Sequence, residues 1–244
     1  MEQIAANLHT VRERIAEAAQ RAGRDPDDVT LVAVCKTFPA ESVIAAYEAG
    51  VRHFGENRVE EATPKIPLVK AGIEGTSPTW HMVGHIQSRK ASDVVACFDY
   101  VHSVDSLKLA QRLSRYAVES GRVLPILLEC NVSGEESKYG FDVRGWSGDS
   151  SCLDAFLDTV ASVLELPGCR VRGLMTMAPW VDDPEIIRPV FSNLRGLSSI
   201  LRERFADANW DELSMGMSDD FEIAIEEGAT LVRIGRAIFG SRPV

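Results

Sequence analysis

The sequence is poor in basic residues, in paired cysteines and in long apolar runs. It has 26 Lys and Arg against 36 Asp and Glu, a formal charge of −10, so a general affinity for nucleic acid is not expected. The five cysteines are far apart and include no C-x-x-C pair, which predicts packed free thiols. No apolar run approaches the roughly 20 residues that span a bilayer, and the first residues lack a signal-peptide core. We therefore expect a soluble, cytoplasmic protein that binds neither nucleic acid nor membranes.

Two common ligand motifs are also absent. No G-x-G-x-x-G follows the first apolar run, which argues against a doubly wound dinucleotide-binding fold. His81 and His85 are four residues apart, but on a predicted strand and turn rather than on a helix. A zinc site is therefore not expected, and we assign no metal ligand.

Short apolar runs alternate with amphipathic helical stretches along the whole chain. We count eight runs, at 31–35, 51–55, 80–84, 100–104, 123–130, 171–175, 212–215 and 230–235. Gly50, Gly121 and Gly228 close helical stretches between them, as glycines beyond a helix C-terminus do. The alternation predicts a single-domain (β/α)₈ TIM barrel over residues 1–244, with an extra N-terminal helix and an irregular excursion at 141–152.

A barrel brings the carboxyl ends of its strands to one mouth, which selects candidate site residues without an alignment. The residues just beyond the predicted strand ends are Lys36, Asn57, His85, Ser103, Asn131, Met177, Ser218, Gly235 and Arg236. Lys36 ends the buried run "LVAVC", where desolvation pushes an amine towards its neutral, nucleophilic form. Lys36 is thus either a solvated strand-end lysine or a Schiff-base lysine.

The last two strand ends have features of a phosphate site. Ser218 and Asp219 can act as N-cap residues of the helix that follows, and Gly235 exposes its backbone N–H groups. The loops after the last two strands are the usual phosphate site of this barrel. Arg233 precedes Gly235 by two residues, so it faces the barrel interior, where it serves either a buried ion pair or a ligand. For His85, both a structural and a site role remain open.

Six stretches together resemble one family. They are "VAVCKTF", "HFGEN", "WHMVGHIQSRK", "CNVSGEESKYGF", "GLMTMAP" and "LSMGMSDDFEIAIEEGATLVRIGRAIFG". They are similar to the pyridoxal phosphate homeostasis proteins, single-domain relatives of the alanine racemase barrel, over about residues 29 to 240. The resemblance implies the alanine racemase N-terminal-domain barrel, which is pyridoxal-phosphate fold type III, with pyridoxal 5′-phosphate as cofactor.

The resemblance also implies roles for individual residues. Lys36 would hold the cofactor as a Schiff base, and Arg233 would face the pyridine nitrogen. Because an arginine does not readily give up a proton, the ring would be a weaker electron sink than one paired with a carboxylate. With the phosphate residues and those lining the ring, the predicted cofactor-binding set is Lys36, Asn57, His85, Met177, Ser218, Arg233, Gly235 and Arg236.

Three functions remain open at this stage. The preferred one is a non-catalytic carrier and buffer of pyridoxal phosphate that supplies apo-enzymes, without any catalytic residue. We expect a monomer, because the sequence ends directly after the last predicted strand, without room for the β-domain that brings racemases a second base. The alternative is an enzyme with weak racemase-type activity, using Lys36 with His85, Ser103 or Lys138. The third is a cofactor-free Schiff-base aldolase.

Overall fold

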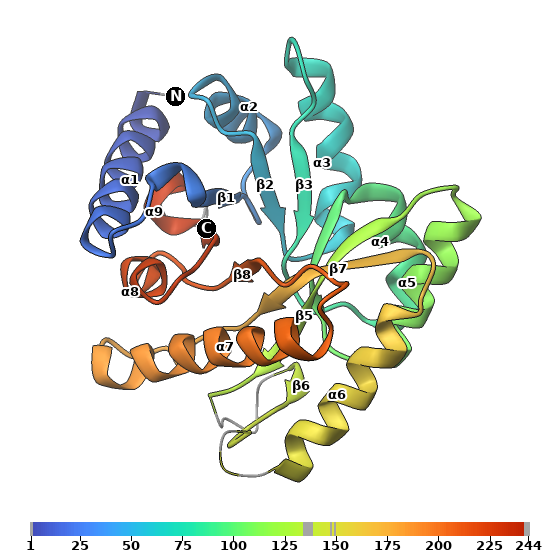
Figure 1. The fold of residues 1–244 in the computed structure, drawn as a ribbon. Helices are drawn as coiled ribbons and strands as arrows, with labels where there is room; N and C mark the ends of the chain where they lie inside the picture. The colour runs from blue at the N-terminus through green and yellow to red at the C-terminus, as the bar shows by residue number, and fades with distance from the viewer. Residues whose placement is uncertain (1, 134–138, 147, 149, 242–244) are drawn as a thin grey trace.

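The computed structural model describes residues 2–133, 139–146, 148 and 150–241. Within these ranges the strands are β1 (Thr30–Val34), β2 (His53–Glu56), β3 (Thr79–Met82), β4 (Tyr100–Val104), β5 (Leu124–Asn131), β6 (Phe141–Asp142), β7 (Cys169–Met175), β8 (Glu212–Ser214) and β9 (Leu231–Ile234). Eight of them pair in parallel in the order β1-β2-β3-β4-β5-β7-β8-β9, and β9 pairs again with β1 (Figure 1). The sheet is therefore closed, which confirms the predicted barrel.

Helices surround the strands, as expected for a sheet of buried parallel strands (Figure 1). They are α1 (Glu2–Arg21), α2 (Ala40–Glu48), α3 (Val59–Gly72), α4 (Ala91–Cys97), α5 (Leu107–Glu119), α6 (Ser150–Leu164), α7 (Pro184–Arg204), α8 (Phe221–Glu226) and α9 (Arg236–Phe239), with short 3₁₀ helices η1 (Pro26–Asp28) and η2 (Ser88–Lys90). The extra N-terminal helix, α1, packs on α8 and α9. In the described part of the chain, none of the helices could cross a bilayer.

Strand β6 is a departure from the prediction. Phe141 and Asp142 pair in parallel with Cys130 and Asn131 at the end of β5, and α6 begins at Ser150. The prediction treats 141–152 as irregular, and it is wrong for these residues. Two residues are too few to give a periodic pattern, so only the tertiary pairing reveals the strand. Residues 147 and 149 of this segment lie outside the described ranges.

The three glycines that were predicted to close helices have the backbone conformation that this role requires. Gly50, Gly121 and Gly228 have φ values of 92°, 68° and 102°. Residues with a Cβ rarely adopt this left-handed region, so glycine is favoured beyond a helix C-terminus. The predicted helix ends at these glycines are confirmed.

The barrel has two separate buried layers. The outer core lies between the strands and the helices and is one apolar cluster, which includes Phe54, Phe98, Leu113 and Phe191. The inner core lies inside the barrel, where Val32 is paired in register with His53 on one side and with Arg233 on the other. Since paired residues of parallel strands face the same side, these three side chains share the interior. Much of the inner core is thus polar.

Candidate functional site

Lys36 lies in a strained turn at the carboxyl end of β1. The N–H of Phe38 donates to the carbonyl of Cys35 at 3.2 Å, and Thr37 between them has a φ of 67°. A positive φ is costly for a β-branched residue, and such strain persists only where neighbouring contacts hold it. Here the N–H of Thr37 donates to Glu61 Oε2 at 2.9 Å. The turn therefore holds Lys36, half-buried, at the barrel mouth.

A buried polar cluster supports this strand end from the outer side. Lys65 Nζ lies 2.5 Å from Glu56 Oε1 and 2.9 Å from the carbonyl of Cys35. The Cys35 thiol also donates to Glu56 Oε1, with a sulfur–oxygen distance of 3.3 Å. Burial, followed by the charge of Glu56, raises the pKa of Cys35 well above its usual range. Cys35 is therefore a protonated thiol that faces away from the mouth.

The turns after β8 and β9 come together beside the end of β1. Ser218 Oγ accepts a hydrogen bond from the N–H of Ala237 at 3.3 Å, and the Arg236 side chain pairs with Asp219. A Cβ on Gly235 would lie 3.0 Å from the carbonyl oxygen of Val34, so the β9 turn packs on β1. The N–H groups at the very start of α9, those of Gly235 and Arg236, have no acceptor within the helix, whereas that of Ile238 donates to the carbonyl of Gly235 at 2.9 Å. The two turns thus bring together Ser218, Gly235 and Arg236, which offer hydrogen-bond donors. They lie beside Val34 of β1, two residues before Lys36.

The start of α8 differs from the prediction. Ser218 and Asp219 were expected to be N-cap residues, but α8 begins at Phe221 and Asp220 occupies the N-cap position. Asp220 Oδ1 accepts from the N–H of Met217 at 2.5 Å and so closes the preceding turn. A Cβ on Gly216 would come within 2.9 Å of the Phe221 Cα atom. The helix thus starts two residues after Asp219, and the pattern of polar residues alone does not reveal which of them is the N-cap.

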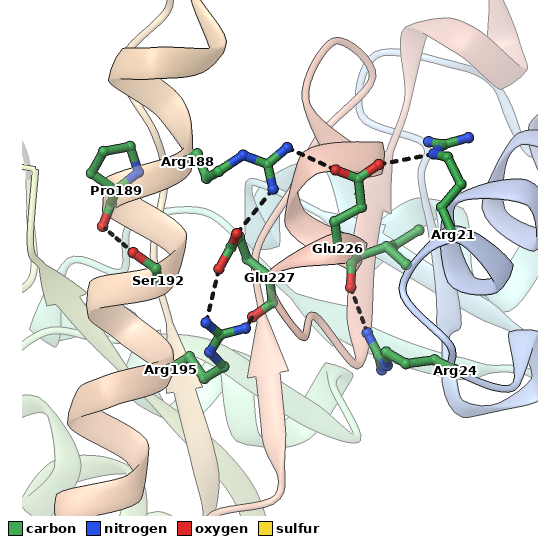
Figure 2. A network of polar contacts seen from close by, with 9 residues as sticks. Arg21, Arg24, Arg188, Pro189, Ser192, Arg195, Glu226 and Glu227 are labelled. Atoms are coloured by element: carbon green, nitrogen blue, oxygen red, sulfur yellow. Dashed lines mark hydrogen bonds and ion pairs between the residues drawn. The ribbon is translucent and has the colours of Figure 1, made fainter.

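An ion-pair network anchors the far end of α8 (Figure 2). Arg188 contacts Glu226 at 2.7 Å and Glu227 at 2.9 Å, while Arg195 contacts Glu227 at 3.1 Å. Arg21 of α1 reaches Glu226 at 3.0 Å. Carboxylates at a helix C-terminus oppose the helix dipole, and these arginines offset that repulsion. The network therefore ties α8 to α1 and α7 and holds the loop that carries Ser218.

Arg233 is buried inside the barrel, as predicted. Its Nη1 donates to Ser214 Oγ at 2.6 Å and its Nη2 to the carbonyl of Thr176 at 2.9 Å. Burial lowers the pKa of Arg233 to about 10, while Asp220 and Glu129 act in the opposite direction. Arg233 is therefore a cation at neutral pH.

Glu129 contributes a buried carboxyl group to the same interior. It lies on β5, which is four strands from β1 in either direction around the closed sheet, so it faces the Lys36 side across the barrel. Burial and the charge of Asp105 raise the pKa of Glu129 to about 7, against the effect of Arg233. Its Oε2 is buried without a hydrogen-bond partner within the described residues. A ligand with a donor group would satisfy this oxygen.

The remaining predicted residues lie at the mouth in different settings. Asn57 is half-buried directly after β2, and Met177 is half-buried after β7. His85 is exposed, with Nδ1 3.0 Å from Asp105 Oδ2 and its ring stacked on Tyr139. A cavity of about 480 Å³ is lined by Asn57 and His85, among other residues of the β2–β3 side.

The candidate second bases are less well placed. Ser103 is buried and donates its hydroxyl to the carbonyl of Gly84 at 2.6 Å. His85 is engaged with Asp105. Lys138 lies outside the described residues. Both described candidates, Ser103 and His85, therefore already have a hydrogen-bond or ion-pair partner.

Sequence reasoning missed the polar residues that line the barrel below the mouth. These are His53, His81, His102, Glu129 and Ser214, and all but His53 are buried. The selection considered only residues beyond strand ends. Polar residues at alternate positions within a predicted barrel strand are the signal that could have found them, since these positions face inward together.

This chain is similar to known proteins over nearly its whole length. The model of the family described as "Alanine racemase, N-terminal domain" matches residues 6–243. The "Pyridoxal phosphate homeostasis protein" of Pseudomonas aeruginosa is 44% identical over 243 residues, covering 99% of this chain and 97% of the relative. The protein of that name from Escherichia coli K12 is 41% identical over 247 residues, covering 99% and 98%.

Solved structures agree with this similarity. PipY of Synechococcus elongatus with PLP bound aligns with a TM-score of 0.80 and 36% identity, over 98% of this chain and all of that chain. Alanine racemase from Streptomyces coelicolor aligns with a TM-score of 0.69 at 17% identity, over 98% of this chain and 59% of that chain. The second comparison concerns the fold alone.

Proposed function

Because this chain belongs to the alanine racemase N-terminal-domain family, and relatives similar over nearly its full length are pyridoxal phosphate homeostasis proteins, we propose that it carries and buffers pyridoxal 5′-phosphate. The observation that carries the proposal is the packing of the Gly235 turn on β1, because it brings backbone donors that would suit an anion close to the strand end that carries Lys36. When bound, the cofactor supplies an aldehyde that condenses with primary amines, and a ring that withdraws electrons.

The residues at the mouth fit such a ligand. Lys36, half-buried at the end of β1, would hold it covalently through its amine. Ser218 and the N–H groups at the start of α9 would hold the phosphate, since hydroxyl and backbone donors suit an anion. Arg233 would donate to the ring nitrogen, because its two described bonds leave other guanidinium donors for a ligand. The unpaired Glu129 oxygen gives the ligand an acceptor.

Asn57, His85 and Met177 complete the proposed cofactor set. Asn57 and Met177 would line the ring, and both are half-buried at strand ends. A cation or hydrogen-bond role for His85 requires it to leave or share Asp105, to which it is paired at 3.0 Å. Lys36, Ser218 and Arg233 would hold the ligand, and His85 would contact it from its pair with Asp105.

The covalent role of Lys36 is tested by titration with pyridoxal 5′-phosphate. Wild-type protein should develop a visible absorbance band, and borohydride should then fix the added mass on the peptide that contains Lys36. Lys36→Arg keeps the charge but removes the nucleophile, so both signals should be lost. Lys108→Ala, on the exposed side of α5, is the matched control. An unchanged band in Lys36→Arg contradicts the assignment.

We also propose that the carrier does not act on amino acids. Support comes from the engagement of Ser103 with Gly84 and of His85 with Asp105, the two described candidates for a second base. Holo-protein incubated with L-alanine in deuterated water should show no enzymatic incorporation of deuterium at Cα. Incorporation that disappears in Lys36→Arg favours the racemase-type alternative. A colourless protein that refuses the added cofactor favours the cofactor-free aldolase.

The proposed setting of this role is the cytoplasm, where a monomer would supply pyridoxal phosphate to apo-enzymes. The names of the relatives support the homeostatic part of this proposal. Light scattering over a range of concentrations checks the monomer. Transfer is checked by mixing the loaded protein with an apo-enzyme and following its reactivation, with Lys36→Arg as the control.

A further inference from the structure

A continuous line of hydrogen bonds crosses the barrel interior and ends on Arg233. Arg233 Nη1 contacts Ser214 Oγ at 2.6 Å, and Ser214 Oγ contacts His102 Nδ1 at 2.8 Å. His102 Nε2 then contacts His81 Nδ1 at 2.8 Å, and His81 Nε2 contacts His53 Nδ1 at 3.0 Å. The five residues come from five different strands. The line runs from the first residue of β2, at the closed end of the barrel, up towards the mouth.

Arginine determines which atom donates and which accepts in each hydrogen bond of this line. A guanidinium only donates, so Ser214 Oγ accepts from Arg233. The proton of the buried Ser214 hydroxyl needs an acceptor of its own, and among the described residues His102 Nδ1, 2.8 Å away, fills that place. His102 therefore carries its proton on Nε2 and donates to His81 Nδ1. By the same logic His81 donates from Nε2 to His53. Each ring is neutral and held in one tautomer, because its neighbour decides which nitrogen is protonated.

The surroundings of the three histidines favour neutral rings. Burial lowers the pKa of His81 to about 3 and that of His102 well below its usual range, and Arg233 lowers the latter further. Burial also lowers the pKa of His53, opposed by Glu212. Since no imidazole is protonated near neutral pH, none repels Arg233.

Other ionisable groups face the two ends of the line. At the lower end, the Tyr100 ring stacks on His81, its hydroxyl contacts Glu212 at 2.5 Å, and Arg172 pairs with Glu212 at 2.9 Å. At the upper end, Asp220 and Glu129 act on Arg233 electrostatically. At the lower end, Arg172 thus offsets the charge of Glu212, the group that acts against the lowered pKa of His53.

We infer that four residues, Ser214, His102, His81 and His53, are positioning residues for Arg233. Together they are called the relay below. They hold its guanidinium in one orientation by hydrogen bonds and leave its positive charge available to the ligand. A carboxylate in the place of Ser214 would also orient the arginine, but it would neutralise it. The inference deepens the proposed function, because it rests on the assignment of Arg233 to the ring of pyridoxal phosphate.

The first test does not need a ligand. Nitrogen-15 NMR of the histidine side chains in the wild-type protein should show His53, His81 and His102 as Nε2–H tautomers. His81 and His102 should stay neutral between pH 8 and about 5, since their pKa values are lowered. Protonated rings in this range, or the opposite tautomers, overturn the inference. Exposed His9, on α1, gives the signal of a surface histidine for comparison.

The second test uses a pair of variants at Ser214. Ser214→Ala removes the link between Arg233 and His102, whereas Ser214→Thr keeps the hydroxyl. Ser214→Ala should still bind pyridoxal phosphate covalently at Lys36, but with a shifted visible band and about tenfold weaker affinity, the effect of losing the orientation of one charged hydrogen bond. Ser214→Thr should restore most of both. Thermal unfolding checks that each variant is folded.

The outcomes separate the two proposals. If Ser214→Ala is folded and has the spectrum and affinity of wild type, the relay does not position Arg233 and the inference is wrong, while the carrier function stands. If wild-type protein takes up no cofactor at all, the proposed function and the role of the relay towards the ligand both fail, whatever the NMR tautomers. If neither Ser214 variant folds, the wild-type tautomers decide whether the relay exists.

Discussion

The outer core and the inner core of this barrel are buried to a similar degree but are built from different residues. The outer core is apolar and joins the strands to the helices. The inner core contains an arginine, a carboxyl group and two fully buried histidines. Apolar burial stabilises a fold directly, whereas buried polar groups are costly unless hydrogen-bonded. Apolar burial between the helices and the outer strand faces therefore stabilises the fold, whereas the interior holds polar groups that depend on hydrogen bonds.

The largest expected effect comes from breaking the outer core. Phe191 of α7 is completely buried, so Phe191→Ala should lower the free energy of unfolding by about 3–5 kcal/mol through lost burial and a cavity. Urea denaturation measures this loss. Cofactor affinity of the folded variant should not change, with Phe191→Leu as a milder control. Weakened affinity in a folded Phe191→Ala protein contradicts the separation of the two layers.

Removal of the buried carboxylate of Glu129 from the inner core should raise the free energy of unfolding, which is the opposite of the effect of Phe191→Ala. Burial favours the protonated form of Glu129 in the folded state, so its ionisation costs stability as pH rises from about 4.5 through about 7. Glu129→Gln should therefore be more stable than wild type by up to about 3 kcal/mol at pH 8, and no more stable below pH 4.5. Denaturation at both pH values decides the matter. Equal gains at both pH values speak against an ionised buried carboxylate.

Acid should destabilise the inner core through its histidines. The folded-state pKa of His81 is about 3, below the unfolded value of 6.5, so its contribution is present above pH 6.5 and is lost as pH falls towards 3. In that window the free energy of unfolding of wild type should fall relative to that of His81→Phe, with a slope of at most about 1.4 kcal/mol per pH unit. Parallel stability curves for the two proteins between pH 6.5 and 4.5 would show that His81 is not buried as a neutral ring.

The smallest expected effect lies outside both cores, in the network of Figure 2. Glu226 pairs with Arg188 and Arg21 at a partly exposed site, so Glu226→Ala should cost about 1 kcal/mol, and less at high salt. Chemical denaturation at low and high salt measures this. Glu2→Ala, at the exposed start of α1, serves as the surface control. A salt-independent loss argues against ion pairing as the cause.

The sequence predicts the outer architecture well because that part follows simple periodicity. "LVAVC" gives β1 through its continuous apolar character, and the C′ glycines give the helix ends. The strand-end rule also places Lys36 and Gly235 at the mouth. It could not give the β6 pairing, because that depends on the tertiary contact of Cys130 with Phe141. It could not give the start of α8 either, because Ser218, Asp219 and Asp220 are all residue types that cap helices.

The inner core shows a different limit of sequence reasoning. His81 and His102 look like ordinary strand residues in "WHM" and "YVHSV", and only the pairing of β3 with β4 brings His81 Nδ1 within 2.8 Å of His102 Nε2. Likewise, Ser214 ends a three-residue strand and gives no sign of its contact with Arg233. Long-range register decides which polar side chains meet, and a single sequence contains no measure of that register.

The orientation of Cys35 has a consequence for chemical selectivity. An aldehyde reacts with sulfur nucleophiles as well as with amines, and the thiolate is the reactive form of cysteine. Here the sulfur adjacent in sequence to Lys36 is protonated, faces Glu56, and is separated from the mouth by its own strand. An aldehyde that reached Lys36 would thus meet its amine and not the thiol of the preceding residue.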